Sequence, residues 1–301
     1  MKILITGSNG LLGQKLLHKL RIDTNVELIA TSLGENRLSA KNGYTYFSLD
    51  ITNNDAVASL IAREKPQVVI NTAAMTNVDL CEDEKQACDA LNVSAVQYLA
   101  DACEKVGAHL IQISTDFIFD GEDGPYKEED KPNPLSYYGL SKLKSEQLLY
   151  NHHVKWTILR TIIVFGVGEN LIKGNIVLWA MGALKKAEPL NIIDDQFRAP
   201  TLAEDLADAC ILAAKKKAYG IFNTSGKDIM SIFEMVECIA NYFGNDTRNL
   251  NRISTSTLNQ KAVRPPRTGF ILDKSRKELG YNPHSFHECL TIIDQQLKNN
   301  K

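Results

Sequence analysis

Short, mainly apolar segments alternate with helical segments through the first half of the chain. The segments that predict strands are residues 2–6, 26–31, 44–49, 68–70 and 109–114. Continuous apolar segments of this kind are typical of parallel sheets, whose strands are buried on both faces. After the first of them, Leu12, Leu16 and Leu20 stand four residues apart and predict the buried stripe of an amphipathic helix. The alternation therefore predicts an α/β fold with a doubly wound parallel sheet and right-handed crossovers.

Three glycines spaced three residues apart follow the first predicted strand. Gly7 permits a tight turn, Gly10 lets the backbone approach a pyrophosphate, and Gly13 lets the helix pack closely on the strand. Backbone N–H groups and the positive end of the helix dipole then face the phosphates. Because the spacing is one residue longer than G-x-G-x-x-G, a purely structural glycine turn is the alternative to a dinucleotide site. The residues expected to contact the cofactor here are Gly7, Asn9, Gly10, Leu11, Leu12 and Gly13.

The end of the second predicted strand indicates which dinucleotide is preferred. Folds that bind NAD usually carry Asp or Glu there to bond the ribose 2′-hydroxyl, but this chain has Thr31 and Ser32. A carboxylate would repel a 2′-phosphate, whereas Arg37 stands nearby to attract one. Ser32 and Arg37 therefore favour NADP, with NAD as the alternative cofactor if Arg37 is only a surface residue.

One Tyr-x-x-x-Lys sequence, from Tyr138 to Lys142, lies on a predicted helix that Ser136 is placed to cap. Residues four apart share a helix face, so the Lys142 ammonium can lie beside the Tyr138 hydroxyl and favour the phenolate. The pairing predicts a group that donates or accepts a proton near neutral pH. Thr115 ends the fifth predicted strand, where α/β sheets bind ligands, and is expected to hold a substrate oxygen. The predicted catalytic residues are therefore Thr115, Tyr138 and Lys142.

These motifs, in this order, resemble those of the extended short-chain dehydrogenase/reductase superfamily. Further segments that fall in its order are Asp50-Ile51, Asn71-Thr72-Ala73-Ala74 and Arg160-Thr161. Within the superfamily the chain most resembles the dTDP-4-dehydrorhamnose reductases. The segments that carry this closer resemblance are residues 114–121 (STDFIFDG), Val78-Asp79, residues 195–201 (DQFRAPT) and Arg264-Pro265.

The resemblance implies a Rossmann-like fold with a smaller, mixed C-terminal substrate-binding region. It also implies hydride transfer from NADPH to the 4-keto group of a nucleotide-linked 6-deoxy sugar. The expected substrate is dTDP-4-dehydrorhamnose and the expected product is dTDP-rhamnose. The cofactor residues that it adds are Asp50, Ile51, Ala73, Ala74 and Asn92, and Tyr138 and Lys142 are expected to contact the cofactor as well. The substrate residues that it adds are Thr76, Val78, Asp116, Phe117, Arg198 and Arg264.

Four of these residues have two interpretations each. Arg198 and Arg264 are expected to clamp a diphosphate bidentately, with surface ion pairs as the alternative. Asn92 is expected either to support the active site or to lie exposed on its helix. Asp116 is expected either to orient the substrate or to cap a turn.

Other functions share much of this motif set. A nucleotide-sugar 4-epimerase usually shows Ser-Ser-x-x-Val-Tyr-Gly where this chain has Ser114-Thr115-Asp116, and it remains an alternative. A second alternative is a non-catalytic NADP-binding subunit that resembles the regulatory subunit of methionine adenosyltransferase. A 4,6-dehydratase is disfavoured because Phe117 follows Asp116 where a glutamate is expected.

The strand–helix alternation weakens after about residue 165, which predicts a domain boundary there. Residues 1–165 are expected to form the dinucleotide-binding domain. Residues 166–301 are expected to be mainly a substrate-binding region, with some of the chain returning to the first domain. In the second half we expect helices near 175–187, 203–217, 231–243 and 285–298. We also expect strands near 190–193 and 221–223, and a loop over 244–272.

Charge and cysteine content exclude several other classes of protein. The 34 Lys+Arg and 36 Asp+Glu residues give a net charge of −2, which does not fit an electrostatic nucleic-acid binder. The six cysteines form no CxxC pair, and the histidines show no ligand spacing, so no metal site is expected. The first apolar segment is too short for a signal peptide, and no run of about 18 apolar residues predicts a membrane span. We therefore expect a cytoplasmic protein that binds a nucleotide-diphosphate sugar, with no nucleic-acid or membrane partner and with a homodimer as the candidate assembly.

Overall fold

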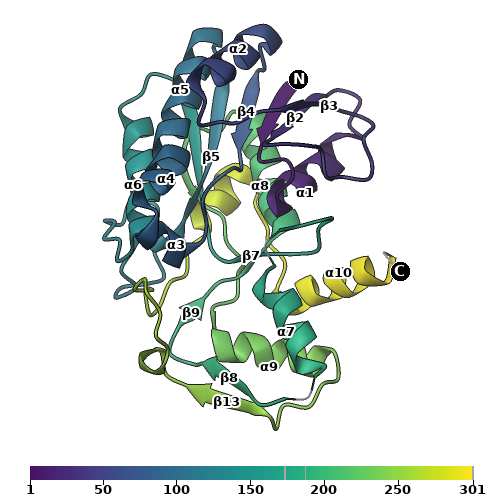
Figure 1. The fold of residues 1–301 in the computed structure, drawn as a ribbon, viewed down its shortest axis with the longest axis vertical. Helices are drawn as coiled ribbons and strands as arrows, with labels where there is room; N and C mark the ends of the chain where they lie inside the picture. The colour runs from purple at the N-terminus through teal and green to yellow at the C-terminus, as the bar shows by residue number, and fades with distance from the viewer. Residues whose placement is uncertain (173, 187, 300–301) are drawn as a thin grey trace.

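The computed structural model describes residues 1–172, 174–186 and 188–299. Its centre is a seven-stranded sheet in the order β11-β6-β5-β4-β1-β2-β3, in which every neighbouring pair of strands is parallel (Figure 1). The strands are β1 (Lys2–Thr6), β2 (Glu27–Ser32), β3 (Thr45–Ser48), β4 (Val68–Asn71), β5 (His109–Thr115), β6 (Lys155–Thr161) and β11 (Gly220–Asn223). This sheet confirms the predicted doubly wound α/β fold.

Helices cover both faces of this sheet, because alternate side chains of each strand point to opposite faces. In β1, Ile3 and Ile5 pack in a core with α1 and α8, whereas Leu4 packs in the core on the other face with α2 and α5. The helices around the sheet are α1 (Leu11–Leu20), α2 (Asn54–Glu64), α3 (Val78–Asp83), α5 (Ala95–Val106), α6 (Tyr137–Tyr150) and α8 (Ala203–Lys216).

The four-residue spacing of Ala87, Leu91, Ala95, Leu99 and Cys103 predicts the buried stripe of one long helix, but the structure divides this segment. It consists of α4 (Lys85–Asp89), a π-helical segment (Ala90–Ser94) and then α5. A π-helical turn adds a residue to the helical repeat, so a four-residue spacing does not follow one face through it. For this reason Ala87, expected in the buried stripe, is exposed, while Asn92 is buried.

The second half of the chain lies beyond the carboxyl edge of the sheet and also returns to it (Figure 1). Helix α8 packs against α1, and β11 pairs with β6 at the edge of the sheet. The other elements of the second half form a separate apolar core, and most of its side chains come from α7, α9 and α10. These elements are β7 (Val164–Phe165), α7 (Ile176–Leu184), β8 (Leu190–Ile193), β9 (Phe197–Arg198), β10 (Thr201–Leu202), β12 (Met230–Ser231), α9 (Ile232–Tyr242), β13 (Leu250–Ile253) and α10 (Phe286–Asn299).

Six of the strands were not expected: β6, β13 and the two-residue strands β7, β9, β10 and β12. Strand β6 contains Thr157 and Arg160, which are buried and bound to polar partners, so its sequence lacks a continuous apolar run. Strand β13 lies in the polar 244–272 segment that was expected to be a loop, and it pairs in parallel with β8. In both cases pairing with a neighbouring strand outweighs the polar composition of the segment.

Candidate active site

The predicted site residues gather at the carboxyl edge of the sheet, because they follow the strands in its middle. The glycine turn follows β1, Ala73 and Ala74 follow β4, and Thr115 ends β5. The strand order reverses between β1 and β4, and open α/β sheets bind their ligands at such a switch point. The three segments therefore lie side by side where the fold favours a binding site.

The glycine turn requires its glycines for steric reasons. Gly7 has a φ of +68°, and a Cβ there would lie 2.8 Å from the backbone nitrogen of Ala73. A Cβ on Gly13 would lie 2.6 Å from Cα of Ser8, so α1 could not approach the turn so closely. The glycines thus bring the start of α1, the turn and the loop after β4 together.

The start of α1 offers donors to an anion. Gly10 is exposed at the N-cap position and gives the helix no side-chain cap. The first N–H groups of a helix have no partner within it, so those of Leu11 and Leu12 are available to a phosphate. In the same turn, the buried hydroxyl of Ser8 has no hydrogen-bond partner among the described residues. This set of unsatisfied polar groups fits a dinucleotide pyrophosphate.

The loop after β2 is shaped by Asn9. The Asn9 side chain donates a hydrogen bond to the carbonyl of Glu35 at 2.8 Å and accepts one from the N–H of Arg37 at 3.0 Å. Ser32 is half-buried at the end of β2. A shallow depression beside it is lined by residues 35–39, Lys41 and Asn170. Two cations, Arg37 and Lys41, thus lie where a 2′-phosphate is expected.

Asp50 and Ile51 follow β3 and have local structural roles. The Asp50 carboxylate accepts hydrogen bonds from the N–H of Thr52 at 2.9 Å and from its hydroxyl at 2.7 Å. The Ile51 side chain is buried in the core around α2 and α5. Contact of either residue with a cofactor stays a prediction.

Helix α6 brings Tyr138 to the end of β5. Ser136 caps the helix as predicted, since its hydroxyl accepts a hydrogen bond from the N–H of Gly139 at 3.2 Å. A Cβ on Gly139 would overlap the carbonyl oxygen of Phe117, so a glycine there permits the close approach. The Tyr138 hydroxyl lies near the hydroxyl of Thr115. The structure therefore places two of the three predicted catalytic groups close together.

The pKa of Tyr138 differs from the prediction. Burial raises this pKa above its usual value, and the nearby Thr115 hydroxyl opposes the effect only in part. The Lys142 ammonium was expected to lower the pKa, but desolvation outweighs any such effect. Tyr138 is therefore protonated at neutral pH, which is the state that a proton donor requires.

Lys142 is almost fully buried on the same helix, with 3% of its surface exposed. Burial lowers the pKa of Lys142 from 10.5 to about 8, and the carboxylate of Glu146 opposes that change. Within the described ranges, Lys142 forms no ion pair with a carboxylate at closer than 4 Å. An ammonium in this setting fits a role in binding a neutral hydroxyl, such as that of a ribose.

We expect activity to fall above about pH 8 because Lys142 then loses its proton. The ratio kcat/KM for the cofactor reports ionisations of the free protein, and it should decrease by about tenfold per pH unit on the alkaline side. Because the Tyr138 pKa is raised, that hydroxyl adds no ionisation in the same range.

Unfolding does not explain such a loss. The folded-state pKa of Lys142 is below its unfolded value, so the unfolded chain binds more protons between about pH 8 and 10.5. The contribution of Lys142 to stability therefore rises with pH over this interval. A rate profile that stays flat to about pH 10 would contradict a role for the ammonium, and circular dichroism at each pH is the control.

Asn92 supports the site from the π-helical segment. It is 1% exposed, which excludes the exposed alternative. Its side chain accepts a hydrogen bond from the N–H of Met75 at 2.8 Å and donates to the Met75 carbonyl at 3.0 Å. It also donates to the hydroxyl of Ser141 on α6 at 3.0 Å. Asn92 therefore joins the loop after β4 to the helix that carries Tyr138 and Lys142.

Asp116 lies inside the protein beside the catalytic groups. Its carboxylate accepts hydrogen bonds from the hydroxyls of Thr115 at 3.1 Å and Thr268 at 2.5 Å. Burial raises the pKa of Asp116, while the nearby guanidinium of Arg198 opposes the increase. Asp116 is thus placed to orient Thr115, and contact with a substrate stays a prediction.

The other substrate candidates lie around the same strand end. The ring of Phe117 packs edge-on against that of Tyr138, with centroids 5.7 Å apart. Thr76 is exposed before α3, and Val78 is half-buried at its start. The structure brings these residues to the carboxyl edge of the sheet, and their contact with a sugar stays a prediction.

The two predicted arginine clamps are both occupied by protein groups. Arg198 is 2% exposed; its guanidinium donates to the carbonyls of Pro265 at 2.6 Å and Phe197 at 2.7 Å. Arg264 forms two hydrogen bonds with the Asp79 carboxylate, at 2.6 and 3.1 Å. Arg264 thus forms the ion pair that was the alternative, Arg198 is buried, and contact of either arginine with a diphosphate stays a prediction. Arg198 supports the loop behind the site, and Arg264 ties that loop to α3.

A buried ion pair behind α6 was not predicted. Glu146 is 0% exposed and forms two hydrogen bonds with the Arg160 guanidinium, at 2.7 and 3.1 Å. The hydroxyl of Ser114 donates to the same carboxylate at 2.5 Å. No local sequence signal indicates this ion pair, because Arg160 lies in the unexpected strand β6 and reaches Ser114 only through the pairing of β5 with β6. This network fixes α6 against β5 and β6.

Comparison with known proteins agrees with this arrangement. Residues 1–298 match the family described as the RmlD substrate binding domain. The chain is 33% identical to a dTDP-4-dehydrorhamnose reductase of Aggregatibacter actinomycetemcomitans, over 97% of this chain and 98% of the relative. It is 32% identical to methionine adenosyltransferase 2 subunit beta of Danio rerio, over 92% of this chain and 84% of that one.

A solved structure is also similar to this chain. The dTDP-4-dehydrorhamnose reductase of Bacillus anthracis, determined in complex with NADP, is 28% identical and superposes with a TM-score of 0.84. That alignment covers 98% of this chain and 99% of the other. By its sequence and its fold, the chain therefore belongs to the RmlD substrate binding domain family.

Proposed function

We propose that this chain is a reductase that uses NADPH to reduce the 4-keto group of dTDP-4-dehydrorhamnose, giving dTDP-rhamnose. The observation that carries the proposal is the protonated Tyr138 hydroxyl near Thr115, on the same helix as buried Lys142, at the switch point of the sheet. A relative of similar length has this name, and a related structure contains NADP.

The residues at the glycine turn fit the cofactor. The uncapped N-terminus of α1 and the Gly7–Gly13 turn would hold the pyrophosphate, and Lys142 would bind the nicotinamide ribose. Arg37 would attract a 2′-phosphate, which favours NADPH over NADH. Bound NADPH supplies the hydride that reduces the keto carbon.

The protein supplies the proton and the position of the substrate. The Thr115 hydroxyl, which donates to Asp116 in this structure, would turn its proton to the keto oxygen once substrate is bound. That hydrogen bond would orient the carbonyl and stabilise the negative charge that develops on it. The Tyr138 phenol then transfers its proton to that oxygen, so that C=O becomes CH–OH. The Lys142 ammonium stabilises the phenolate that remains on Tyr138, until a proton from solvent restores the phenol.

The substrate is expected to lie between the strand ends and the C-terminal region. Thr76, Val78 and Phe117 would contact the sugar. Phe117 packs against Tyr138, whereas Thr76 lies just before α3 and Val78 at its start, and α3 packs against α6. Arg264 would reach the diphosphate only by exchanging the Asp79 carboxylate for a phosphate. Loading the site with a nucleotide sugar should therefore loosen the contact of the loop with α3.

The direct test is the oxidation of NADPH in the presence of dTDP-4-dehydrorhamnose, with identification of the sugar product. We expect turnover with this substrate, slower turnover with NADH, and little with other keto sugars. NADPH binding without turnover of any keto sugar would overturn the proposal in favour of a regulatory subunit, which the similarity to methionine adenosyltransferase 2 subunit beta supports. Epimerisation of a nucleotide sugar without net NADPH oxidation would overturn it in favour of a 4-epimerase.

We also propose that this reaction takes place in the cytoplasm. The cysteines are free thiols, and Cys238 is the exposed one of the six, which fits a reducing compartment. Among the described segments, no helix combines the length and the apolar character that spanning a membrane requires. A homodimer stays a prediction, which sedimentation equilibrium of the purified chain would test.

A further inference from the structure

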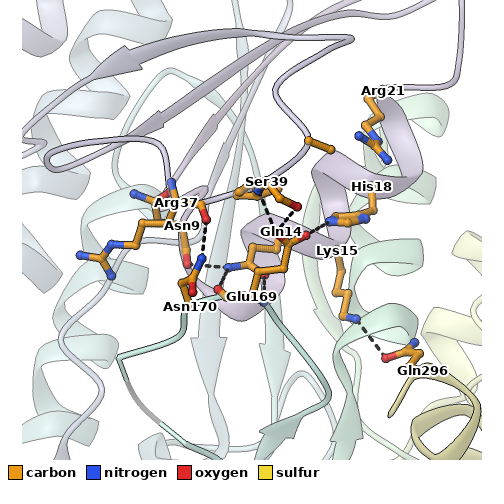
Figure 2. Close-up of polar contacts among 12 residues, drawn as sticks. Asn9, Gln14, Lys15, His18, Arg21, Arg37, Ser39, Glu169, Asn170 and Gln296 are labelled. Atoms are coloured by element: carbon orange, nitrogen blue, oxygen red, sulfur yellow. Dashed lines mark hydrogen bonds and ion pairs between the residues drawn. The ribbon is translucent and has the colours of Figure 1, made fainter. Parts of the chain in front are cut away.

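A segment from the second half of the chain contacts the glycine turn (Figure 2). This segment, residues 166–170, follows β7, and Gln14 of α1 binds its backbone. The Gln14 side chain donates to the carbonyls of Glu169 at 2.7 Å and Asn9 at 3.0 Å, and accepts from the N–H of Glu169 at 2.8 Å. Gln14 is 1% exposed, so these hydrogen bonds are shielded from water. The segment is therefore fixed to the start of α1.

The same segment binds the loop after β2 through its side chains. One carboxylate oxygen of Glu169 accepts hydrogen bonds from the N–H of Ser39 at 2.8 Å and from its hydroxyl at 2.6 Å. The side-chain amide of Asn170 donates to the carbonyl of Arg37 at 3.0 Å. The Ser39 hydrogen bonds keep the pKa of Glu169 below its usual value, while nearby His18 and Arg21 add a smaller effect. Glu169 is thus ionised at neutral pH.

The backbone of Arg37 is therefore held from two sides. Asn9 binds its N–H, and Asn170 binds its carbonyl. Figure 2 shows the guanidinium pointing away from Glu169 and Asn170, and its charge is not neutralised by an ion pair within the described residues. A cation whose backbone is fixed while its charge stays available is preorganised to bind a phosphate.

We propose that Glu169 and Asn170 are positioning residues that hold Arg37 for the 2′-phosphate of NADPH, so that the segment after β7 determines the preference for NADPH over NADH. The inference rests on the proposed function because it requires that NADPH binds to the glycine turn. NADH lacks the 2′-phosphate and does not need Arg37. Loss of the positioning contacts should therefore weaken the binding of one cofactor and leave the other unchanged.

Two variants remove the contacts separately. Asn170→Gly deletes the amide and suits the positive φ of this residue, +46°, and Glu169→Ala deletes the carboxylate. Dissociation constants for NADPH and NADH are measured by fluorescence titration. For each variant we expect the Kd of NADPH to increase about three- to tenfold and that of NADH to change by less than about twofold. Equal weakening of both cofactors, or no change in either, would overturn the inference.

A double-mutant cycle tests whether the two residues act through Arg37. In an Arg37→Ala background, Asn170→Gly should have no further effect on NADPH affinity, whereas an additive effect would overturn the proposal. Lys15→Met is the matched control, because Lys15 lies on α1 nearby but contacts Gln296 and Glu204 instead. It should leave both dissociation constants unchanged. Since the measurement is binding, a chain that binds NADPH without reducing a keto sugar would overturn the proposed reaction and not this inference.

Discussion

Tyr138→Phe should lower kcat by about 10²–10⁴-fold, with little change in cofactor affinity or thermal stability. The substitution removes the hydroxyl that donates the proton and lies near Thr115, but it retains the ring that packs against Phe117. The loss therefore concerns an interaction with the transition state and not the packing of the site. Steady-state kinetics with NADPH and the keto sugar, together with a thermal melt, measure both parts of the expectation.

The adjacent tyrosine provides the control. Tyr137 points about 100° away around the helix, and its hydroxyl donates to the Asp89 carboxylate at 2.8 Å, next to Lys144. Tyr137→Phe removes the same atom one position away, and we expect kcat to stay within about tenfold of the unchanged protein. If the two variants lose activity equally, or if Tyr138→Phe stays active, the catalytic assignment of α6 is wrong.

Glu146→Ala should lower the free energy of unfolding by about 3–5 kcal/mol, because it leaves the Arg160 guanidinium buried without its partner. Arg160 is 1% exposed, so water cannot replace the lost carboxylate without a rearrangement of the core. The Ser114 hydroxyl and the Tyr150 hydroxyl lose their acceptor in the same variant. Urea unfolding with an unchanged m-value would measure the difference.

Two further variants distinguish a lost ion pair from a general loss of packing. Replacing both partners, as in Glu146→Leu with Arg160→Met, should restore most of the stability, since neither charge is then buried alone. Lys298→Ala removes a partner from an exposed pair on α10 and should leave the unfolding transition unchanged. A loss of less than about 1 kcal/mol in Glu146→Ala would mean that the buried pair does not stabilise the fold.

The sheet and most of its helices could be predicted because their signals are local. The apolar run of residues 2–6, the glycines that follow it and the leucines of α1 each depend on neighbours within a few residues. The Ser136 cap is a local signal of the same kind. Strand β6 could not be found in this way, because Thr157 and Arg160 are polar residues buried by partners from distant parts of the chain.

The polar partners of the site residues could not be predicted from the sequence for the same reason. Arg264 follows Asp79 by 185 positions, so nothing near either residue indicates that they are paired. The pKa of Tyr138 depends on burial, which the four-residue spacing to Lys142 does not reveal. The contacts of Glu169 and Asn170 with the loop after β2 likewise join segments about 130 residues apart. Spacing predicts which residues share a helix face, but the partner of a charge is chosen by the tertiary fold.

The late position of β11 in the chain has a consequence for biosynthesis. While the ribosome is still making residues 166–219, β6 is an open edge whose backbone N–H and C=O groups can pair with another chain. The apolar face of α1 is also uncovered until α8 has been made. A nascent chain at this stage should therefore be prone to aggregation and depend on chaperones. A fragment that stops at residue 165 keeps these exposed surfaces permanently and should accumulate in inclusion bodies, whereas the full chain should not.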